Sequence, residues 1–325
     1  MIYLIVFAGL IILELLYFRI ATFFNIVDKP NARSSHTVVT LRGGGVIFYI
    51  TGLLYFILSG FQYPWFFLGL TIMASVSFLD DIFTLSNRLR LLAHFSSVLL
   101  MSVQLDVFTM PWLYLLMTFV VTVGIINAFN FMDGINGITA SYSLAVGMLL
   151  IIINQAIGFI AQDLLIYSML GVIVFGFFNF RTKAKCFAGD VGSVTIAYIL
   201  TFALGALILK TGNLLYFLFL AVYGIDTVWT IIRRLYLKEN IFEAHRSHLY
   251  QLLGNEAGGN KLLISFCYGA FQFFLGLAVI YMANRDASEQ LMFSLIVLGV
   301  LSLFYLLLKT WVIRKYNRSY EIGDN

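Results

Sequence analysis

Residues 111–137 read PWLYLLMTFVVTVGIINAFNFMDGING, and this stretch shows how the chain is organised. Its first part, residues 111–129, is almost wholly apolar and matches the roughly 20 residues that a helix needs to cross a membrane. The run ends in Asn127, Asn130 and Asp133, which recur every three residues and therefore share one helix face. A polar stripe at the end of an apolar helix has no packing role, so we interpret it as part of a functional site at the membrane surface.

Apolar segments of this length recur along the whole chain. Hydrophobic residues make up 61% of it and charged residues 11%, against about 45–50% and about 25% in soluble proteins. We therefore predict an all-α, polytopic helical membrane protein that forms one integral-membrane domain over residues 1–325. The eleven expected spans are residues 2–20, 44–60, 64–80, 91–107, 111–129, 137–155, 161–178, 191–209, 213–231, 262–283 and 290–310.

The distribution of basic residues predicts the orientation of these spans. With the N-terminus outside, 18 of the 20 lysine and arginine residues fall on the inside, and only Lys210 and Arg285 fall outside. This asymmetry follows the positive-inside rule. The net charge of +4 has the same origin, because no separate basic stripe exists, so nucleic-acid binding is not indicated. The longer connections also lie inside, and we expect the chemistry to face the cytoplasm.

Acidic residues stand at or near the ends of the apolar segments on this predicted inner side. They are Asp80, Asp81, Asp133, Asp190 and Asp226. A carboxylate at membrane depth costs several kcal/mol unless it has a partner or a function. Neighbouring side chains on a helix point about 100° apart, so one aspartate of the adjacent pair is expected to face a metal ion. The other would orient it or meet a basic residue. The pattern indicates a metal-dependent site that acts on a lipid.

Two glycine-rich segments offer binding groups for phosphate. Arg42 precedes Gly43–Gly45, whose backbone could approach a phosphate or a neighbouring helix; a flexible entry turn is the alternative. The basic segment around Lys185 leads into Gly189-Asp190-Val-Gly-Ser193, which combines cations, a helix N-terminus and a carboxylate. That combination suits a pyrophosphate bridged to Mg²⁺ through Asp190.

A histidine-containing segment follows the ninth span. Asp226 and the pair Arg233-Arg234 precede His245, Arg246 and His248. Two histidines alone are weak evidence for zinc, which usually takes three or four nitrogen or sulfur ligands. Phosphate contact is the favoured interpretation, and a solvated loop remains the alternative.

With these segments in order, the chain resembles the polyprenyl-phosphate N-acetylhexosamine-1-phosphate transferases over about residues 20–255, its expected catalytic core. The matching motifs are Asp80-Asp81, then Asn127, Asn130, Asp133 and Gly134, then Gly189 to Ser193, then Asp226 with Arg233-Arg234. Asn136 replaces a second aspartate that many members have, and Tyr250 and Gln251 replace histidines after His248. The histidine segment is similar to the corresponding segment in the branch of the family that primes O-antigen and surface polysaccharides.

The resemblance implies transfer of a sugar 1-phosphate from a UDP-N-acetylhexosamine to undecaprenyl phosphate, with release of UMP. It implies Mg²⁺, or Mn²⁺ in its place, at a cytoplasmic site in the bacterial inner membrane. The expected catalytic residues are Asp80, Asp81, Asp133 and Asp190, of which Asp190 and Asp133 are the expected metal ligands. The expected substrate-binding residues are Arg42, Arg88, Arg90, Asn127, Asn130, Asn179, Lys185, Asp226, His245, Arg246 and His248.

Several alternatives remain open at this point. A phospho-N-acetylmuramoyl-pentapeptide transferase would use a related donor. A lipid or ion transporter would also need intramembrane acids, but it would be expected to place them near the membrane midplane on broken helices. The sequence does not fix the sugar or the glycan that is built. It also leaves open a covalent aspartyl-phosphate intermediate and the oligomeric state, for which a homodimer is one option.

Overall fold

The computed structural model describes residues 1–30, 35–240 and 245–316. Helices dominate it, and a single two-stranded ribbon is present in these ranges. The elements are α1 (Ile2–Phe23), β1 (Val27–Asp28), β2 (Thr40–Leu41), α2 (Val46–Leu58), α3 (Pro64–Phe83), α4 (Asn87–Gln104), η1 (Val107–Thr109), α5 (Trp112–Met132), α6 (Ile138–Ile157), α7 (Gln162–Asn179), α8 (Gly189–Thr211), η2 (Leu214–Leu220), α9 (Ala221–Tyr236), α10 (Leu249–Gln251), η3 (Leu252–Glu256), α11 (Lys261–Met282) and α12 (Ala287–Tyr316).

The prediction of an all-α, polytopic membrane protein is confirmed. Each expected span falls on a helix, or on η2 and α9 in succession. Within the described ranges, nine of these segments are long and apolar enough to cross a membrane. The other two differ: α2 has only 13 residues, and α4 carries Arg88, Arg90 and His94 in its first half, which lowers its hydropathy.

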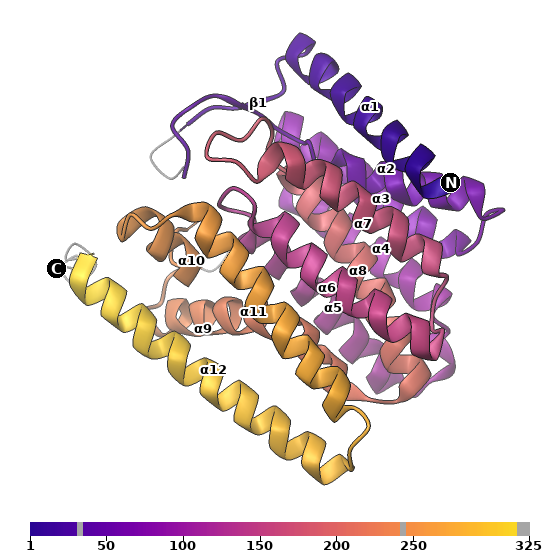
Figure 1. Cartoon of the computed structure of the whole chain (residues 1–325), viewed down its shortest axis with the longest axis vertical. Coiled ribbons are helices and arrows are strands. Elements are labelled where there is room, and N and C mark those ends of the chain that lie inside the picture. Colours follow the sequence, from indigo (N-terminus) through magenta and orange to yellow (C-terminus); the bar gives the residue numbers. More distant parts are fainter. Residues whose placement is uncertain (31–34, 241–244, 317–325) are drawn as a thin grey trace.

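Helix α8 forms the centre of the bundle, and α1 and α12 lie at its edges (Figure 1). In α8, 89% of an apolar stretch of 18 residues is buried, against 6% of the corresponding stretch in α12. Helix α8 packs on α3, α5, α2 and α6. The helix that carries Asp190 at its N-terminus is therefore held on several sides, whereas α12 leaves most of its apolar surface to lipid.

Three glycines at the start of α2 allow a very close contact with α8. The N–H groups of Gly44 and Gly45 donate to the carbonyl groups of Phe187 and Ala188, at 2.9 and 3.1 Å. A Cβ atom on Gly45 would overlap the backbone of Gly192. Of the three roles left open for this segment, the structure shows the approach to a neighbouring helix, because the N–H groups of Gly44 and Gly45 already have protein acceptors.

We expect Gly45→Ala to destabilise the protein. The added methyl group has backbone on the other side, which cannot rotate away, and overpacking of a tight core costs about 1–3 kcal/mol or more. The melting temperature of the purified protein in detergent measures the effect. Gly9→Ala in α1 is the matched control, because nothing lies within 4 Å of its Cβ position. Equal melting temperatures for both variants would contradict the close packing.

Candidate active site

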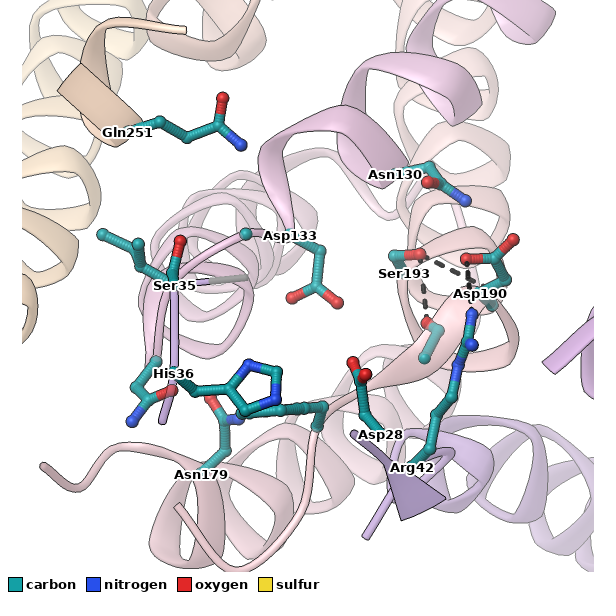
Figure 2. A pocket seen from close by; sticks show the side chains of 15 residues that line it. Asp28, Ser35, His36, Arg42, Asn130, Asp133, Asn179, Asp190, Ser193 and Gln251 are labelled. Carbon is teal, nitrogen blue, oxygen red and sulfur yellow. Dashed lines mark hydrogen bonds and ion pairs between the residues drawn. The ribbon is translucent and has the colours of Figure 1, made fainter. Parts of the chain in front are cut away.

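A polar cavity of about 340 Å³ lies where the ends of several helices meet the first loop. Asn130 and Asp133 come from the end of α5, and Asp190 and Ser193 from the start of α8. Asp28 is the last residue of β1, and Arg42 directly follows β2. Figure 2 shows Asp28, His36 and Asp133 around its middle, with Arg42 and Asp190 on one side. Segments far apart in the sequence thus build one site at one end of the bundle.

Asp81 anchors the start of α8. Its carboxylate accepts the N–H groups of Asp190 and Val191, at 2.9 and 3.0 Å, and the Arg42 Nε at 2.7 Å. The side chain of Asp81 is fully buried. The first N–H groups of α8, which the sequence offers to a pyrophosphate, are therefore taken by a carboxylate of α3. Asp81 positions Asp190 and Arg42 at the cavity, and it does not itself line the cavity.

Asp80 turns to a different partner, as expected for adjacent residues on a helix. It accepts the N–H of Leu85 at 2.6 Å and pairs with Arg90 at 3.3 Å. Arg90 also lies 3.5 Å from the Asp190 carboxylate, and Arg42 lies 3.8 Å from it. Three aspartates and two arginines therefore form one network in which Asp190 is held on both sides by a cation but makes no short hydrogen bond to either.

Asp133 is the second carboxylate of the cavity. It follows the last residue of α5 and accepts the hydroxyl of Thr139 at 2.5 Å. Desolvation by the surrounding protein raises the pKa of the Asp133 carboxyl to about 7, and the charges of Asp190 and Asp81 act in the same direction. A cation placed beside this carboxyl group would favour its ionised form and lower its pKa.

The oxygen donors of the cavity fit a hard divalent cation. Asp133, Asp190, Asn130 and Ser193 all offer oxygen atoms, and Mg²⁺ typically uses one or two carboxylates together with waters and substrate phosphates. Within the described residues, no group of three or more His, Cys, Asp or Glu side chains forms a complete metal cage. The arrangement therefore suits a cation completed by a substrate, and does not suit a structural metal site.

Some of the residues expected to bind substrate lie away from the cavity. Asn127 donates to the carbonyl of Val123 in its own helix, at 2.8 Å. Arg88 and Lys185 are exposed and do not line the cavity. The polar periodicity of α5 identified the helix face that carries Asn127 and Asn130, but it did not show that the cavity ends before Asn127. Arg88 and Lys185 are explained equally well by the excess of basic residues on the inner side of a membrane protein.

Asn179 lines the cavity but both ends of its amide are used by the protein. Its Oδ1 accepts the N–H of Gly137 at 2.7 Å, and its Nδ2 donates to the carbonyl of Cys186 at 2.9 Å. Asn136 similarly donates to the carbonyl of Arg181 at 2.7 Å. Both asparagines join the α5–α6 turn to the segment before α8, so their role in the structure is to hold the cavity walls together.

The cavity also includes residues that the sequence did not single out as binding groups. They are Asp28, Ser35, His36, Ser193 and Gln251. The His36 ring packs against Phe187, with centroids 4.6 Å apart. Asn255 donates to Ser35 Oγ at 3.0 Å, and Lys261 donates to its carbonyl. The available signal was the polar segment after the first span, but only the fold shows that it reaches the cavity.

Asp226 and His248 form a separate buried cluster. His248 Nδ1 lies 3.2 Å from Asp226 Oδ1, and neither residue lines the cavity. His245 stacks on His248 with centroids 5.0 Å apart, and desolvation lowers the pKa of His245 to about 3, so its ring is neutral at pH 7. Arg246 lies 3.9 Å from Glu256. The two histidines therefore lie together. The neutral ring of His245 can form hydrogen bonds but carries no positive charge.

The fold and the cavity define a polytopic membrane protein with a carboxylate- and arginine-lined site at one end of its helices. The sequence model of glycosyl transferase family 4 matches residues 63–209, which run from the start of α3 to the end of α8. This range contains Asp80, Asp81, Asp133 and Asp190. Over this range the chain is similar to glycosyl transferase family 4.

Several curated proteins are similar to this chain. A probable undecaprenyl-phosphate N-acetylglucosaminyl 1-phosphate transferase of Bacillus subtilis is 28% identical over 72% of this chain and 71% of its own length. An undecaprenyl-phosphate alpha-N-acetylglucosaminyl 1-phosphate transferase of Thermotoga maritima is 28% identical over 73% and 76%. A phospho-N-acetylmuramoyl-pentapeptide-transferase of Streptococcus gordonii is 34% identical over 49% and 50%.

Proposed function

We propose that the protein transfers N-acetylglucosamine 1-phosphate from UDP-N-acetylglucosamine to undecaprenyl phosphate and releases UMP. The observation that carries the proposal is the cavity in which Asp133, Asp190 and Arg42 meet at the ends of membrane helices. Such a site can bring a phosphate at the membrane surface next to a water-soluble phosphorylated donor. The names of relatives that match 72–93% of the chain support this transferred group and this acceptor.

The positions of the acids favour a transferase over a transporter. Asp80, Asp81 and Asp190 gather at helix ends in one network with Arg42 and Arg90. Asp133, also at a helix end, lines the same cavity as Asp190. A transporter would be expected to place such groups near the membrane midplane on interrupted helices. The basic residues that surround this end support a cytoplasmic location in a bacterial inner membrane.

We assign the Mg²⁺ site to Asp133 and Asp190. When bound, the cation would neutralise the phosphate oxygens on which negative charge accumulates. Arg42 and Arg90 add positive charge beside Asp190. Because two anionic substrates must meet, charge neutralisation by preorganised groups is the largest contribution that this site can make.

The reaction needs little help from a general base. A phosphate monoester has a second pKa near 6, so undecaprenyl phosphate is mostly dianionic at pH 7. One of its oxygens forms a bond to the β-phosphorus of the donor, and the bond between that phosphorus and the bridging oxygen breaks. The electron pair leaves with UMP. Asp81 and Asp80 act in this scheme by holding Asp190, Arg42 and Arg90 in place.

The lipid-linked product would start a surface polysaccharide such as O-antigen. The competing donor is UDP-N-acetylmuramoyl-pentapeptide, because proteins that are named for that step match about half of this chain. The relatives named for N-acetylglucosamine match 59–93% of it. We therefore expect the smaller donor to be preferred.

A UMP-release assay with purified protein tests this proposal. We expect release with UDP-N-acetylglucosamine only when undecaprenyl phosphate and Mg²⁺ are both present. EDTA should abolish release and added Mg²⁺ or Mn²⁺ should restore it. The donor panel includes UDP-N-acetylgalactosamine and UDP-N-acetylmuramoyl-pentapeptide. If only UDP-N-acetylmuramoyl-pentapeptide among these donors gave UMP release, the donor would be reassigned. UMP release without undecaprenyl phosphate would contradict the transfer reaction.

A further inference from the structure

The short helix α10 sends one polar side chain into the cavity. Of its three residues, only Gln251 lines the cavity, where it is half-buried. Figure 2 shows Gln251 well apart from Arg42 and Asp190, with its amide nitrogen turned toward the middle of the cavity. The roles assigned so far to the charged residues make no use of this group, so its own contribution to the site has to be found.

Helix α10 is tied to two membrane helices. The carboxylate of Asp226, in α9, accepts the N–H groups of Leu249 and Tyr250 at 3.0 and 3.4 Å. The hydroxyl of Tyr250 donates to the carbonyl of Phe131, in the last turn of α5, at 2.9 Å. The backbone that carries the cavity residue is therefore held in place on both sides.

A glycine lets α10 approach the second carboxylate of the cavity. A Cβ atom on Gly134 would lie 2.2 Å from the hydroxyl oxygen of Tyr250 and 3.1 Å from Gln251 Nε2. Gly134 directly follows Asp133 in the chain. The amide nitrogen of Gln251 thus lies beside the backbone next to Asp133, at a position that the packing of α10 determines.

A capping interaction fixes which end of the amide faces the ligand. The N–H of His248 donates to Gln251 Oε1 at 3.4 Å, as part of a capping box at the start of α10. Because a backbone N–H only donates, the amide atom next to it is the oxygen. Gln251 Nε2 donates to none of the described residues. Its two N–H groups are available to a molecule in the cavity.

Two other polar residues of the cavity are already engaged by the protein. The Oγ of Ser35 accepts from Asn255 at 3.0 Å, and its carbonyl accepts from Lys261. The Nδ2 of Asn136 donates to a carbonyl of the α7–α8 segment at 2.7 Å. In contrast to these groups, Gln251 has an oriented hydrogen-bond donor to spare.

The charge of the cavity divides the parts of a nucleotide sugar between its two sides. Asp133, Asp190 and Arg42 suit the diphosphate and its cation, as argued above. A carboxamide is neutral, and its N–H groups suit an uncharged acceptor such as a carbonyl oxygen. UDP-N-acetylglucosamine carries carbonyl groups on both sides of its diphosphate, in the acetamido group of the sugar and in the uracil ring.

We propose that Gln251 is a binding residue for the nucleotide sugar, with Nε2 donating to a carbonyl oxygen of its uncharged part. The inference rests on the proposed function, because it takes a UDP-N-acetylhexosamine as the molecule in the cavity. It adds a neutral contact from α10 to a site whose other assigned residues act through charge. The acetamido group and the uracil ring are the two sources of the carbonyl, and binding measurements distinguish them.

The dissociation constant of UDP-N-acetylglucosamine tests the contact. It is measured with Mg²⁺ and without undecaprenyl phosphate, so that no turnover occurs, on full-length wild type, Gln251→Met and Gln251→Glu. Gln251→Met removes the donor at similar size and should weaken binding about fivefold, the effect of one neutral hydrogen bond. Gln251→Glu keeps the capping oxygen but replaces the donor by an acceptor, and it should weaken binding at least as much.

A matched control separates this contact from general effects of the substitution. Gln290 lies at the opposite end of the bundle, where its Nε2 donates to the carbonyl groups of Ala283 and Arg285 at 3.1 and 2.7 Å. Gln290→Met makes the same chemical change away from the cavity and should bind as the wild type does. Gel filtration and melting temperature show that each variant is folded, and the bonds of Asp226 and Tyr250 should keep α10 in place.

UDP-glucose and UDP identify the carbonyl that Gln251 binds. UDP-glucose lacks the acetamido group, and UDP lacks the sugar but keeps uracil. A contact to the acetamido carbonyl predicts that Gln251→Met weakens only the binding of UDP-N-acetylglucosamine. A contact to uracil predicts the same loss with all three ligands.

UDP-N-acetylglucosamine affinity of Gln251→Met equal to that of Gln290→Met would overturn the proposal. A loss confined to Gln251→Glu would do the same, because it would report only repulsion between the new carboxylate and the anionic ligand. Absence of UDP-N-acetylglucosamine binding by the wild type would instead count against the proposed function.

Discussion

Asp190→Asn is expected to lower turnover about 10³-fold while leaving the protein folded. Loss of the carboxylate charge that holds a metal ion against a phosphate removes several kcal/mol of transition-state stabilisation. Each 1.36 kcal/mol corresponds to about a factor of ten in rate. The fold should persist because the backbone N–H of Asp190 still reaches Asp81, and its carboxylate makes only ion pairs of 3.5 and 3.8 Å. Single-turnover kinetics and the melting temperature measure the two effects.

Asp106→Asn serves as the matched control for this variant. Asp106 is exposed and lies between α4 and η1, and asparagine tolerates its left-handed backbone conformation. The control should keep full activity. Turnover of Asp190→Asn within a few-fold of the control would remove Asp190 from the metal site.

Asp81→Ala should remove activity and also destabilise the protein. Its carboxylate accepts the N–H groups of Asp190 and Val191 and the Arg42 guanidinium. Each buried donor left without an acceptor costs about 1–3 kcal/mol, and the start of α8 loses the negative charge that suits a helix N-terminus. We expect a melting temperature several degrees below that of Asp190→Asn, measured in the same detergent.

The comparison between these two aspartates separates chemistry from support. If Asp81→Ala kept the melting temperature of the wild type, the anchoring role would be wrong. If it kept activity at a lower melting temperature, the link from Asp81 to the position of Asp190 would be wrong.

The overall class of fold and many of the site residues could be predicted from the sequence. Hydrophobic length located the helices, and the polar stripe of α5 led to Asn130 and Asp133. The direction of Asp81 could not be predicted, because its partner is the backbone of α8, which is distant in sequence. The same limit applies to Gly45, whose tight contact depends on the position of Gly192 and not on local propensity.

The contact of α12 with α9 also required the structure, because Lys309 Nζ donates to Thr230 Oγ1 at 3.0 Å. Lys309 stands near the end of an apolar helix, where a basic residue is expected from topology alone. Nothing in its neighbourhood indicates Thr230, which precedes it by 79 positions along the chain. In contrast, the exposed Arg88 and Lys185 show that basic residues near a motif need not reach its site.

The most direct test of the central claim follows the β-phosphate of the donor. UDP-N-acetylglucosamine labelled in its β-phosphate is incubated with the purified protein, undecaprenyl phosphate and Mg²⁺, and the lipid and water phases are separated. Transfer of a sugar 1-phosphate predicts that the label enters the lipid in equal amount to the UMP released. Sugar in the lipid without the label, or label that stays in water as UMP appears, would contradict it.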